Sequence, residues 1–258
     1  KRLPGFVIRY LRRIVHEDEL NEFLSIYGHL EGVPFIAGAL EFMNTNIRVV
    51  GLDHIPASGR AIVASNHPLG GLDGLALMLT VAKKRNDLVF PVNDILMNVK
   101  NLDPLFIPIN KHGSNTDNIR IINDTFASDK IICYFPAGLV SRKKRGIIKD
   151  LEWHPTFITK AKRFKREIIP THISGRNSNF FYNIAKLRKL LHIKANLEML
   201  YLVDEFHNQK NNTLTITFGK PVSYEVFDHR HTRPEWAARM RDFIYLLEEN
   251  PDAVFLSD

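Results

Sequence analysis

The sequence has a single cysteine and no long uninterrupted run of apolar residues. Cys133 is the only cysteine among 258 residues, which excludes disulfide bonds within the chain and fits a reducing compartment. Charged residues interrupt each apolar run before it reaches the roughly 18 residues that a membrane span requires. No signal-peptide pattern opens the sequence. The histidines lack the spacing of metal ligands, so no metal site is expected.

Basic residues are present in excess. The chain has 35 Lys and Arg against 28 Asp and Glu, a net charge of +7 and a pI of about 9.4. This excess favours an anionic partner, such as nucleic acid, a phosphorylated substrate, a phosphopantetheine carrier or an acidic lipid surface. A hydrophobic fraction of 45% is ordinary for a globular protein. The length suits one large domain with at most a small appendage.

Residues 1–47 are predicted to be an amphipathic helical segment. In 1–14, apolar side chains recur at three- and four-residue steps while arginines occupy the opposite face. The pattern loses phase at 16–19, where acidic residues suit the first turn of a second helix. Such a segment either lies in a membrane interface or packs as a surface helix on the main domain.

Residues 48–258 alternate between β-rich and helical stretches. The alternation predicts an α/β domain with a central, largely parallel or mixed sheet flanked by helices. Strands are expected at 48–52, 61–65, 88–92, 105–109, 130–135, 167–173, 197–203 and 213–219. Helices are expected at 73–84, 115–128, 154–165 and 235–249, the last preceded by a capping box of Thr232 and Glu235.

The stretch ASNHPLGGLDG, residues 64–74, lies where a strand is expected to end and a helix to begin. His67 and Asp73 would be about 240° apart on one continuous helix, so they can meet only across a loop. Pro68 and the Gly70–Gly71 pair favour such a loop. The two side chains then form a proton-handling pair, or else Asp73 only caps the helix and His67 sits in a turn.

Two later strand ends carry polar residues. FPAG, 135–138, predicts a sharp turn, and Ser141 and Arg142 follow it at the start of a basic run. Backbone N–H groups of such a turn, beside an arginine, can hold a phosphate or an oxyanion; a solvated basic loop is the alternative. EIIPTHISGRNS adds His172 and Arg176.

The order of these motifs resembles the glycerophospholipid acyltransferase family of the lysophosphatidic acid acyltransferase type. That family has an NHxxxxD block, a glycine-led block ending in arginine, an FPEGTRS block and a final apolar-proline block. The resemblance runs from about Arg48 to Pro221. It is strongest to the bacterial subgroup of hemolysin-like and amino-acid-lipid acyltransferases.

The resemblance implies transfer of an acyl group from an acyl carrier protein or coenzyme A thioester to a hydroxyl or amine. His67 would be the general base and Asp73 its orienting partner, with no bound cofactor or metal. The N-terminal helices would guide acyl chains and dock on an anionic membrane, so that the protein is peripheral at the cytoplasmic face of the inner membrane. The implied substrate-binding residues are Asn66, Gly70, Gly71, Asn110, Lys111, Gly138, Ser141, Arg142, His172 and Arg176.

Several positions depart from the family pattern. The spacing of His67 and Asp73 is one residue longer than usual, and Ala137 and Leu139 replace the usual glutamate and threonine. Asn110 replaces the arginine of the second block, next to Lys111. These departures weaken the case for a glycerol phosphate acceptor and leave an amino-acid lipid as a serious option.

Three other functions compete with an acyltransferase. A nucleic-acid-binding module would use the basic residues, but no recognition pattern is present, and the cations of 160–166 are interpreted as the solvated face of a helix. A non-catalytic lipid-binding relative is suggested by Ala137. A hydrolase could use His67 and Asp73, although no GxSxG block supplies a nucleophilic serine. Cys133 lies in an expected buried strand and is not expected to be reactive.

Overall fold

The computed structural model describes residues 4–92, 96–108 and 115–255. Its central sheet has five strands in the order β1-β9-β8-β2-β5. Neighbouring strands are parallel except β8 and β9, which are antiparallel. The bounds are β1 Asn46–Val50, β2 Ala61–Ser65, β5 Ile132–Tyr134, β8 Glu167–Ile173 and β9 Thr213–Phe218. The predicted α/β class with a largely parallel or mixed sheet is confirmed.

Two short strand pairs accompany the central sheet. β3 (Phe90–Val92) and β4 (Phe106–Pro108) are parallel, and a bridge between Val89 and Ile132 links them to β5. β6 (Arg142–Lys144) and β7 (Ile147–Lys149) form an antiparallel hairpin. Every residue of β2 is buried, as expected for a strand covered on both faces.

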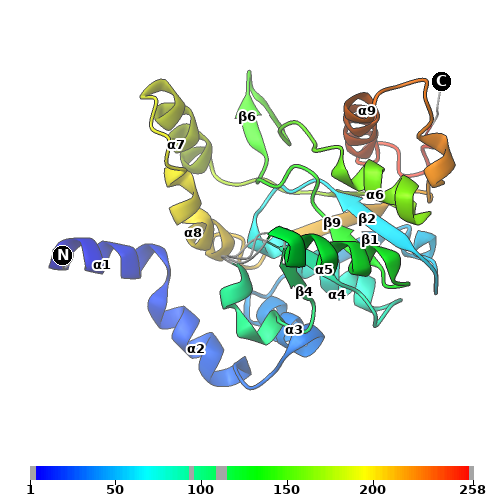
Figure 1. Ribbon diagram of the computed structural model, residues 1–258. Helices are drawn as coiled ribbons and strands as arrows, with labels where there is room; N and C mark the ends of the chain where they lie inside the picture. The colour runs from blue at the N-terminus through cyan, green and yellow to red at the C-terminus, as the bar shows by residue number, and fades with distance from the viewer. Residues whose placement is uncertain (1–3, 93–95, 109–114, 256–258) are drawn as a thin grey trace.

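Helices cover both faces of the sheet (Figure 1). Along β2 the side chains alternate, so that Val63 belongs to one core cluster and Ile62 to the other. The first cluster contains α3 (Gly32–Phe42) and α4 (Gly71–Ala82); the second contains α5 (Asn115–Ala127), α6 (Thr156–Phe164) and α9 (Arg233–Leu246). The predicted capping box of Thr232 and Glu235 opens α9.

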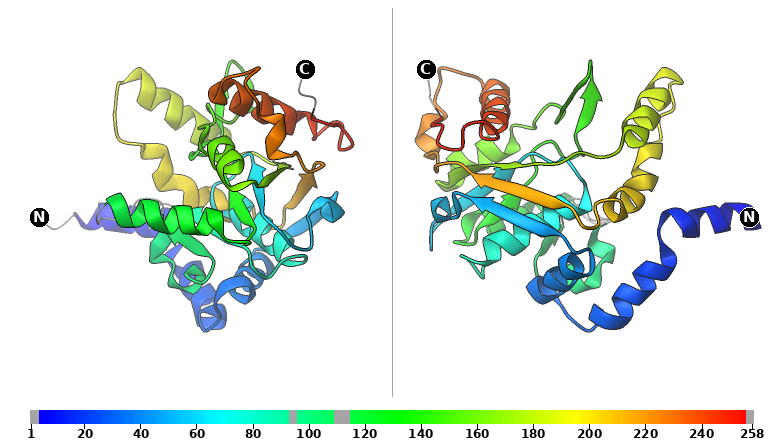
Figure 2. Two further views of the ribbon diagram at one scale, coloured as in Figure 1. Left: turned by 45° about the vertical axis from the view of Figure 1, so that its right-hand side comes forward. Right: turned by 180° about the vertical axis from the view of Figure 1, so that it is seen from behind.

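The N-terminal segment forms α1 (Gly5–Ile14) and α2 (Glu17–Tyr27), which project from the sheet (Figure 2). The predicted change of phase is confirmed: the chain turns at His16, whose φ of 50° ends the helical path. In contrast, α3 packs on α4 in the main core. A division into two domains near residue 47 stays a prediction.

A second projection follows β8. It consists of α7 (Asn179–Leu190), a 3₁₀ helix Leu197–Tyr201 and α8 (Leu202–His207). The prediction of a strand at 197–203 was therefore wrong. Leu200 and Val203 are exposed, so this apolar run does not enter the sheet. None of the helices in the described ranges is long and apolar enough to cross a membrane.

The interpretation of 160–166 as a solvated helix face was wrong for Arg166. This residue follows α6 and is fully buried. Its guanidinium donates to the carbonyl oxygens of Phe126, Ala61, Lys130, Thr125 and Ser128. Burial lowers its pKa to about 10. Arg166 thus joins the end of α5 to β2 through these hydrogen bonds, which also satisfy its buried guanidinium.

Candidate active site

The loop between β2 and α4 is fixed to the neighbouring strand by Asn66. Its side-chain amide donates to the carbonyl of Ile173 at 2.9 Å, and its oxygen accepts from the Ile173 N–H at 2.7 Å. This pair of bonds joins the ends of β2 and β8. Asn66 is also buried. Because it is fixed in this way, it sets the position of the next residue, His67.

His67 and Asp73 meet across the glycine turn. The Nδ1 atom of His67 lies 3.0 Å from Oδ2 of Asp73. The same carboxylate accepts from the N–H groups of Leu69 and Gly70 at 2.8 and 3.3 Å, while its other oxygen accepts from Gly74 at 2.9 Å. Gly70 has a φ of 94°, which an L side chain rarely adopts. The predicted N-cap role was wrong in position, because Gly70 is the N-cap and Asp73 the third residue of α4; from there Asp73 accepts from the Gly70 N–H and also contacts His67.

The surroundings of His67 favour its positive charge. Burial opposes the charge, but the carboxylate of Asp73, its hydrogen bond and the charge of Asp150 outweigh burial and raise the pKa of His67 above its ordinary value. The imidazole stacks on Phe135, with ring centroids 4.1 Å apart. With Nδ1 held by Asp73, Nε2 is the nitrogen left for chemistry.

Asp150 is a buried carboxylate that hydrogen-bonds to the loop between β2 and α4. One oxygen accepts from the His67 N–H at 3.2 Å and from the Ser141 hydroxyl at 2.5 Å; the other accepts from Trp153 Nε1 at 2.9 Å. Its own N–H donates to the hydroxyl of Tyr245. Burial raises the pKa of Asp150, although these donors oppose that rise.

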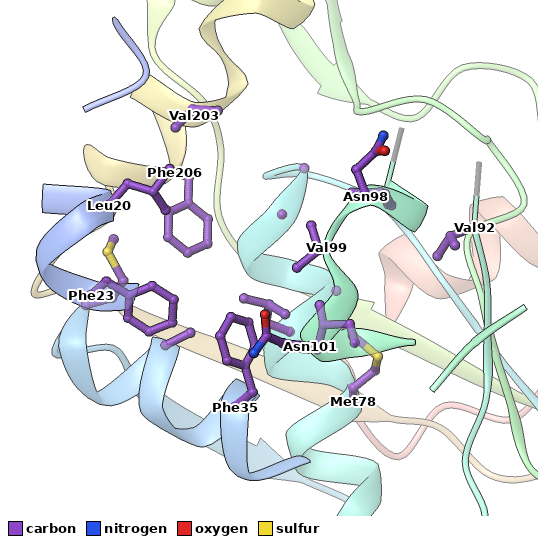
Figure 3. A pocket seen from close by; sticks show the side chains of 18 of the residues that line it. Leu20, Phe23, Phe35, Met78, Val92, Asn98, Val99, Asn101, Val203 and Phe206 are labelled. Atoms are coloured by element: carbon purple, nitrogen blue, oxygen red, sulfur yellow. The ribbon is translucent and has the colours of Figure 1, made fainter. Parts of the chain in front are cut away.

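A large apolar cavity of about 680 Å³ adjoins the pair. His67, Gly70 and Gly71 lie on its lining. Figure 3 shows side chains from four helices around it: Leu20 and Phe23 of α2, Phe35 of α3, Met78 of α4, and Val203 and Phe206 of α8. Apolar side chains with few polar groups are what a hydrocarbon chain requires.

Ser141 and Arg142 are engaged within the protein. Ser141 binds Asp150, and its N–H donates to the carbonyl of His67 at 2.8 Å. Arg142 is buried, donates to the carbonyl of Val140 and pairs with Glu198 at 3.0 Å. Gly138 occupies an exposed turn with a φ of 63°. Contact of these three residues with substrate stays a prediction.

His172 and Arg176 lie on a second cavity, of about 290 Å³, together with Asn66 and Ser141. The structure thus separates these residues from the apolar cavity that His67 lines. Burial lowers the pKa of His172 to about 4, so this imidazole is neutral. Asn110 and Lys111 lie outside the described residues.

One group of side chains in the described ranges has the composition of a metal site. The ligand atoms of His16, Glu19 and His207 lie within 4.8 Å of one another. The two imidazole rings stack at 3.8 Å with an interplanar angle of 17°, and His16 bonds to Asp204 at 2.8 Å. The stacked rings and the hydrogen bond to Asp204 hold α8 against the corner between α1 and α2.

The sequence did not single out Asp150, Phe135 or Glu198. Phe135 begins the FPAG turn and was interpreted as backbone geometry alone, although its ring stacks on His67. Asp150 and Glu198 are isolated carboxylates without a motif. The contacts that bring them to the site, of Asp150 with His67 and of Glu198 with Arg142, join residues 83 and 56 positions apart, so spacing carries no signal of them.

A half-buried histidine paired with a buried carboxylate lies beside an apolar cavity, at the end of a parallel strand, where it can move a proton during a reaction such as acyl transfer. Comparison with known proteins agrees. The model of the family described as "Acyltransferase" matches residues 1–254. The chain belongs to this family and is an acyltransferase enzyme.

Similar proteins narrow the class. The chain is 46% identical over 249 residues to a lyso-glycine lipid O-acyltransferase of Phocaeicola vulgatus, covering 96% of this chain and 89% of that protein. A protein of the same name from Bacteroides thetaiotaomicron is 43% identical over 96% and 92% of the two chains. The 1-acyl-sn-glycerophosphate acyltransferase PlsC of Thermotoga maritima has a similar fold, with a TM-score of 0.54, 14% identity and coverage of 84% and 78%. The predicted class, a PlsC-like acyltransferase of lipid synthesis, is confirmed.

Proposed function

We propose that this enzyme transfers a fatty acyl group from an acyl carrier protein or coenzyme A thioester to the hydroxyl of a lyso-glycine lipid, with His67 as general base and Asp73 as its orienting partner. The observation that carries this proposal is the 3.0 Å pair of His67 and Asp73 on the lining of an apolar cavity of about 680 Å³. The family and its relatives support the reaction; the geometry supports the roles.

The acceptor follows from the relatives together with the departures in the sequence. Both lyso-glycine lipid O-acyltransferases align with 96% of the chain at 43–46% identity. Ala137 of the FPAG turn, which stands where the usual family pattern has a glutamate, is buried. Arg142 pairs with Glu198. Neither position offers a free charge to a glycerol phosphate. The departures from the glycerol phosphate pattern and the names of the two relatives together support an amino-acid lipid as acceptor.

In the proposed reaction, Nε2 of His67 takes the proton of the acceptor hydroxyl while the oxygen of that hydroxyl attacks the thioester carbonyl carbon. Asp73 stabilises the resulting imidazolium, as the raised pKa of His67 indicates. The tetrahedral intermediate then breaks its C–S bond, and the leaving thiolate takes the proton from His67. The products are an ester and a free thiol, with no covalent enzyme intermediate and no metal.

The acyl chain is proposed to occupy the apolar cavity, and α1 and α2 to dock on an anionic membrane at the cytoplasmic face. α2 supplies Leu20 and Phe23 to the cavity. On α1, Phe6 is 68% exposed, and basic side chains occupy the last turn. An exposed apolar and basic helix beside the cavity fits peripheral attachment.

A panel assay tests the proposal. Labelled acyl carrier protein and acyl-coenzyme A would each be offered with lyso-glycine lipid, lysophosphatidic acid and glycerol 3-phosphate. We expect an ester product with lyso-glycine lipid that depends on His67. Release of free fatty acid without any ester would indicate a hydrolase, and absence of any reaction would indicate a lipid-binding protein. Product with lysophosphatidic acid alone would overturn the acceptor.

A further inference from the structure

We propose that the arm formed by residues 179–207, which comprises α7, the 3₁₀ helix and α8, is a second membrane-docking surface that binds anionic lipid beside the mouth of the acyl cavity. This inference rests on the proposed function, because a lipid acceptor has to reach His67 from a bilayer. It adds a surface that neither the N-terminal helices nor the site residues include.

The exposed face of the arm is apolar. Single exposed hydrophobic side chains are common, but large contiguous groups of them are rare on a protein that stays in water. Here they follow one another along the end of α7 and the segment after it. They include Leu187, Leu190, Leu191, Ile193, Leu197 and Leu200, whose exposed fractions range from 37% to 72%.

The exposed charges of residues 179–203 are of one sign. Lys186, Lys189 and Lys194 are exposed and lie among the leucines. Glu198 is the only acidic residue between 179 and 203, and it is fully buried against Arg142. In the rest of the arm, Glu205 is buried and Asp204, 30% exposed, pairs with His16. Exposed lysines with no exposed carboxylate in this segment, interleaved with leucine, complement an anionic bilayer surface.

The arm is continuous with the cavity and with α1–α2. Val203 and Phe206 of α8 line the cavity. The hydroxyls of Tyr10 and Tyr201 are hydrogen-bonded, and His16 bonds to Asp204. Both projections lie on the same side of the sheet (Figure 2). When α1–α2 and the arm both contact a bilayer, the cavity opens between them. A lipid that leaves the bilayer there therefore enters the cavity.

Buried polar contacts fix the arm to the catalytic region. Glu198 accepts from Arg142, the arginine that follows the FPAG turn, and from Arg188 of α7 at 3.3 Å. α8 packs directly on the catalytic loop: a Cβ on Gly70 would lie 3.1 Å from Leu202, and one on Gly71 would lie 3.2 Å from Phe206. Arg142 thus has a definite role as an anchor of the arm.

Vesicle flotation with the full chain tests this surface. The vesicles would contain phosphatidylcholine alone or an equal mixture with phosphatidylglycerol. One variant carries Leu187→Gln, Leu190→Gln and Leu191→Gln; another carries Lys186→Gln, Lys189→Gln and Lys194→Gln. The controls change exposed residues of the same types on other elements, Leu246→Gln with Val254→Gln, and Lys83→Gln with Lys162→Gln and Lys220→Gln.

We expect the leucine variant to bind both kinds of vesicle at least tenfold more weakly. The lysine variant should lose at least tenfold on the anionic vesicles only, since each lysine near such a surface contributes roughly fivefold. The controls should stay within about twofold of the wild type. Vesicle binding that is equal in all variants would overturn the proposal. So would a lysine variant with a raised KM for acyl carrier protein and unchanged flotation, which would assign the arm to a protein partner.

Activity on detergent-dispersed acceptor separates this inference from the proposed function. All arm variants should retain the activity on detergent-dispersed acceptor, because none of the changed residues lines the cavity. Their activity on vesicle-bound acceptor should fall in parallel with vesicle binding. A wild-type enzyme that floats with anionic vesicles but transfers no acyl group would contradict the proposed function and leave the docking surface standing.

Discussion

Asp73 holds Nδ1 of His67 and thereby leaves Nε2 for the substrate. The carboxylate has no exposed surface and is surrounded by N–H donors from its own loop. These hydrogen bonds fix the carboxylate against the imidazole, with Oδ2 3.0 Å from Nδ1, and the charge of Asp73 helps to raise the pKa of His67. Orientation and charge support at His67 thus come from one residue.

Asp73→Asn tests this division of roles. The amide keeps the size of the side chain but cannot stabilise the imidazolium or hold the required tautomer, so we expect kcat to fall by about 10³–10⁴. Circular dichroism and thermal unfolding would verify the fold, and acyl-transfer kinetics would measure the loss. A variant within tenfold of the wild type would show that Asp73 only caps α4.

The pH dependence of kcat/KM reports on the same pair. A general base has to be neutral, so activity should rise with pH through the pKa of His67, which is raised above its ordinary value of about 6.5. Asp150 contributes to that rise, so Asp150→Asn should move the acidic limb of the profile to lower pH. An acidic limb that stays in place in this variant would contradict the contribution of Asp150.

His172 makes stability depend on pH in a known direction. Its pKa in the folded state is about 4 and that of an unfolded histidine is about 6.5, so protonation favours the unfolded state. The stability that its neutral form permits is complete above about pH 6.5 and falls by up to about 3 kcal/mol as the pH drops towards 4.

The comparison of wild type with His172→Gln isolates this effect. Denaturant unfolding at several pH values should show a flatter profile between about pH 6.5 and 4 in the variant, whatever its stability at neutral pH. Profiles of equal slope in the two proteins would contradict a buried neutral imidazole.

At the scale of elements, α2, α3, α4 and α8 together enclose the proposed acyl site. Met78 of α4 lies on the cavity lining and is almost fully buried. Because cores respond to a change of even one methylene, the side chain at this position should limit the length of the bound chain.

Met78→Trp is expected to shorten the preferred acyl chain. The larger ring fills part of the cavity, so kcat/KM for a palmitoyl donor should fall at least about tenfold relative to a decanoyl donor, the effect of one or two excluded methylenes. Met78→Leu, which conserves volume, serves as the control and should keep the wild-type preference. An unchanged ratio in the tryptophan variant would place the acyl chain elsewhere.

Helices and strands with a regular hydrophobic pattern could be predicted from the sequence. Which other elements they pair with or pack on could not be predicted. Alternation of strands and helices was sufficient for the α/β class and for the helix that follows the HPLGG turn. The segment 197–203 has the composition of a strand but forms helices, because it packs on the loop glycines and no sheet edge receives it. The antiparallel pairing of β8 with β9 has no local signal.

At the scale of the whole molecule, the site contains one contact that the sequence could predict. It also contains contacts between distant residues that the sequence could not predict. His67 and Asp73 are six positions apart, so a loop could bring them together; the resemblance to the acyltransferase family favoured their contact over a simple helix cap, and they lie 3.0 Å apart. Arg142 was expected at an anion site because a basic run follows a turn, but its partner Glu198 comes from the arm. Long-range contacts of this kind depend on the packed fold.

Acyl transfer from a labelled thioester to lyso-glycine lipid by the wild type and by His67→Ala tests the central claim most directly. The account predicts an ester product with the wild type and a rate at least about 10³-fold lower in the variant, at unchanged thermal stability. Equal rates in the two proteins would contradict the account, because the cavity would then be a binding site and His67 would have no part in the chemistry.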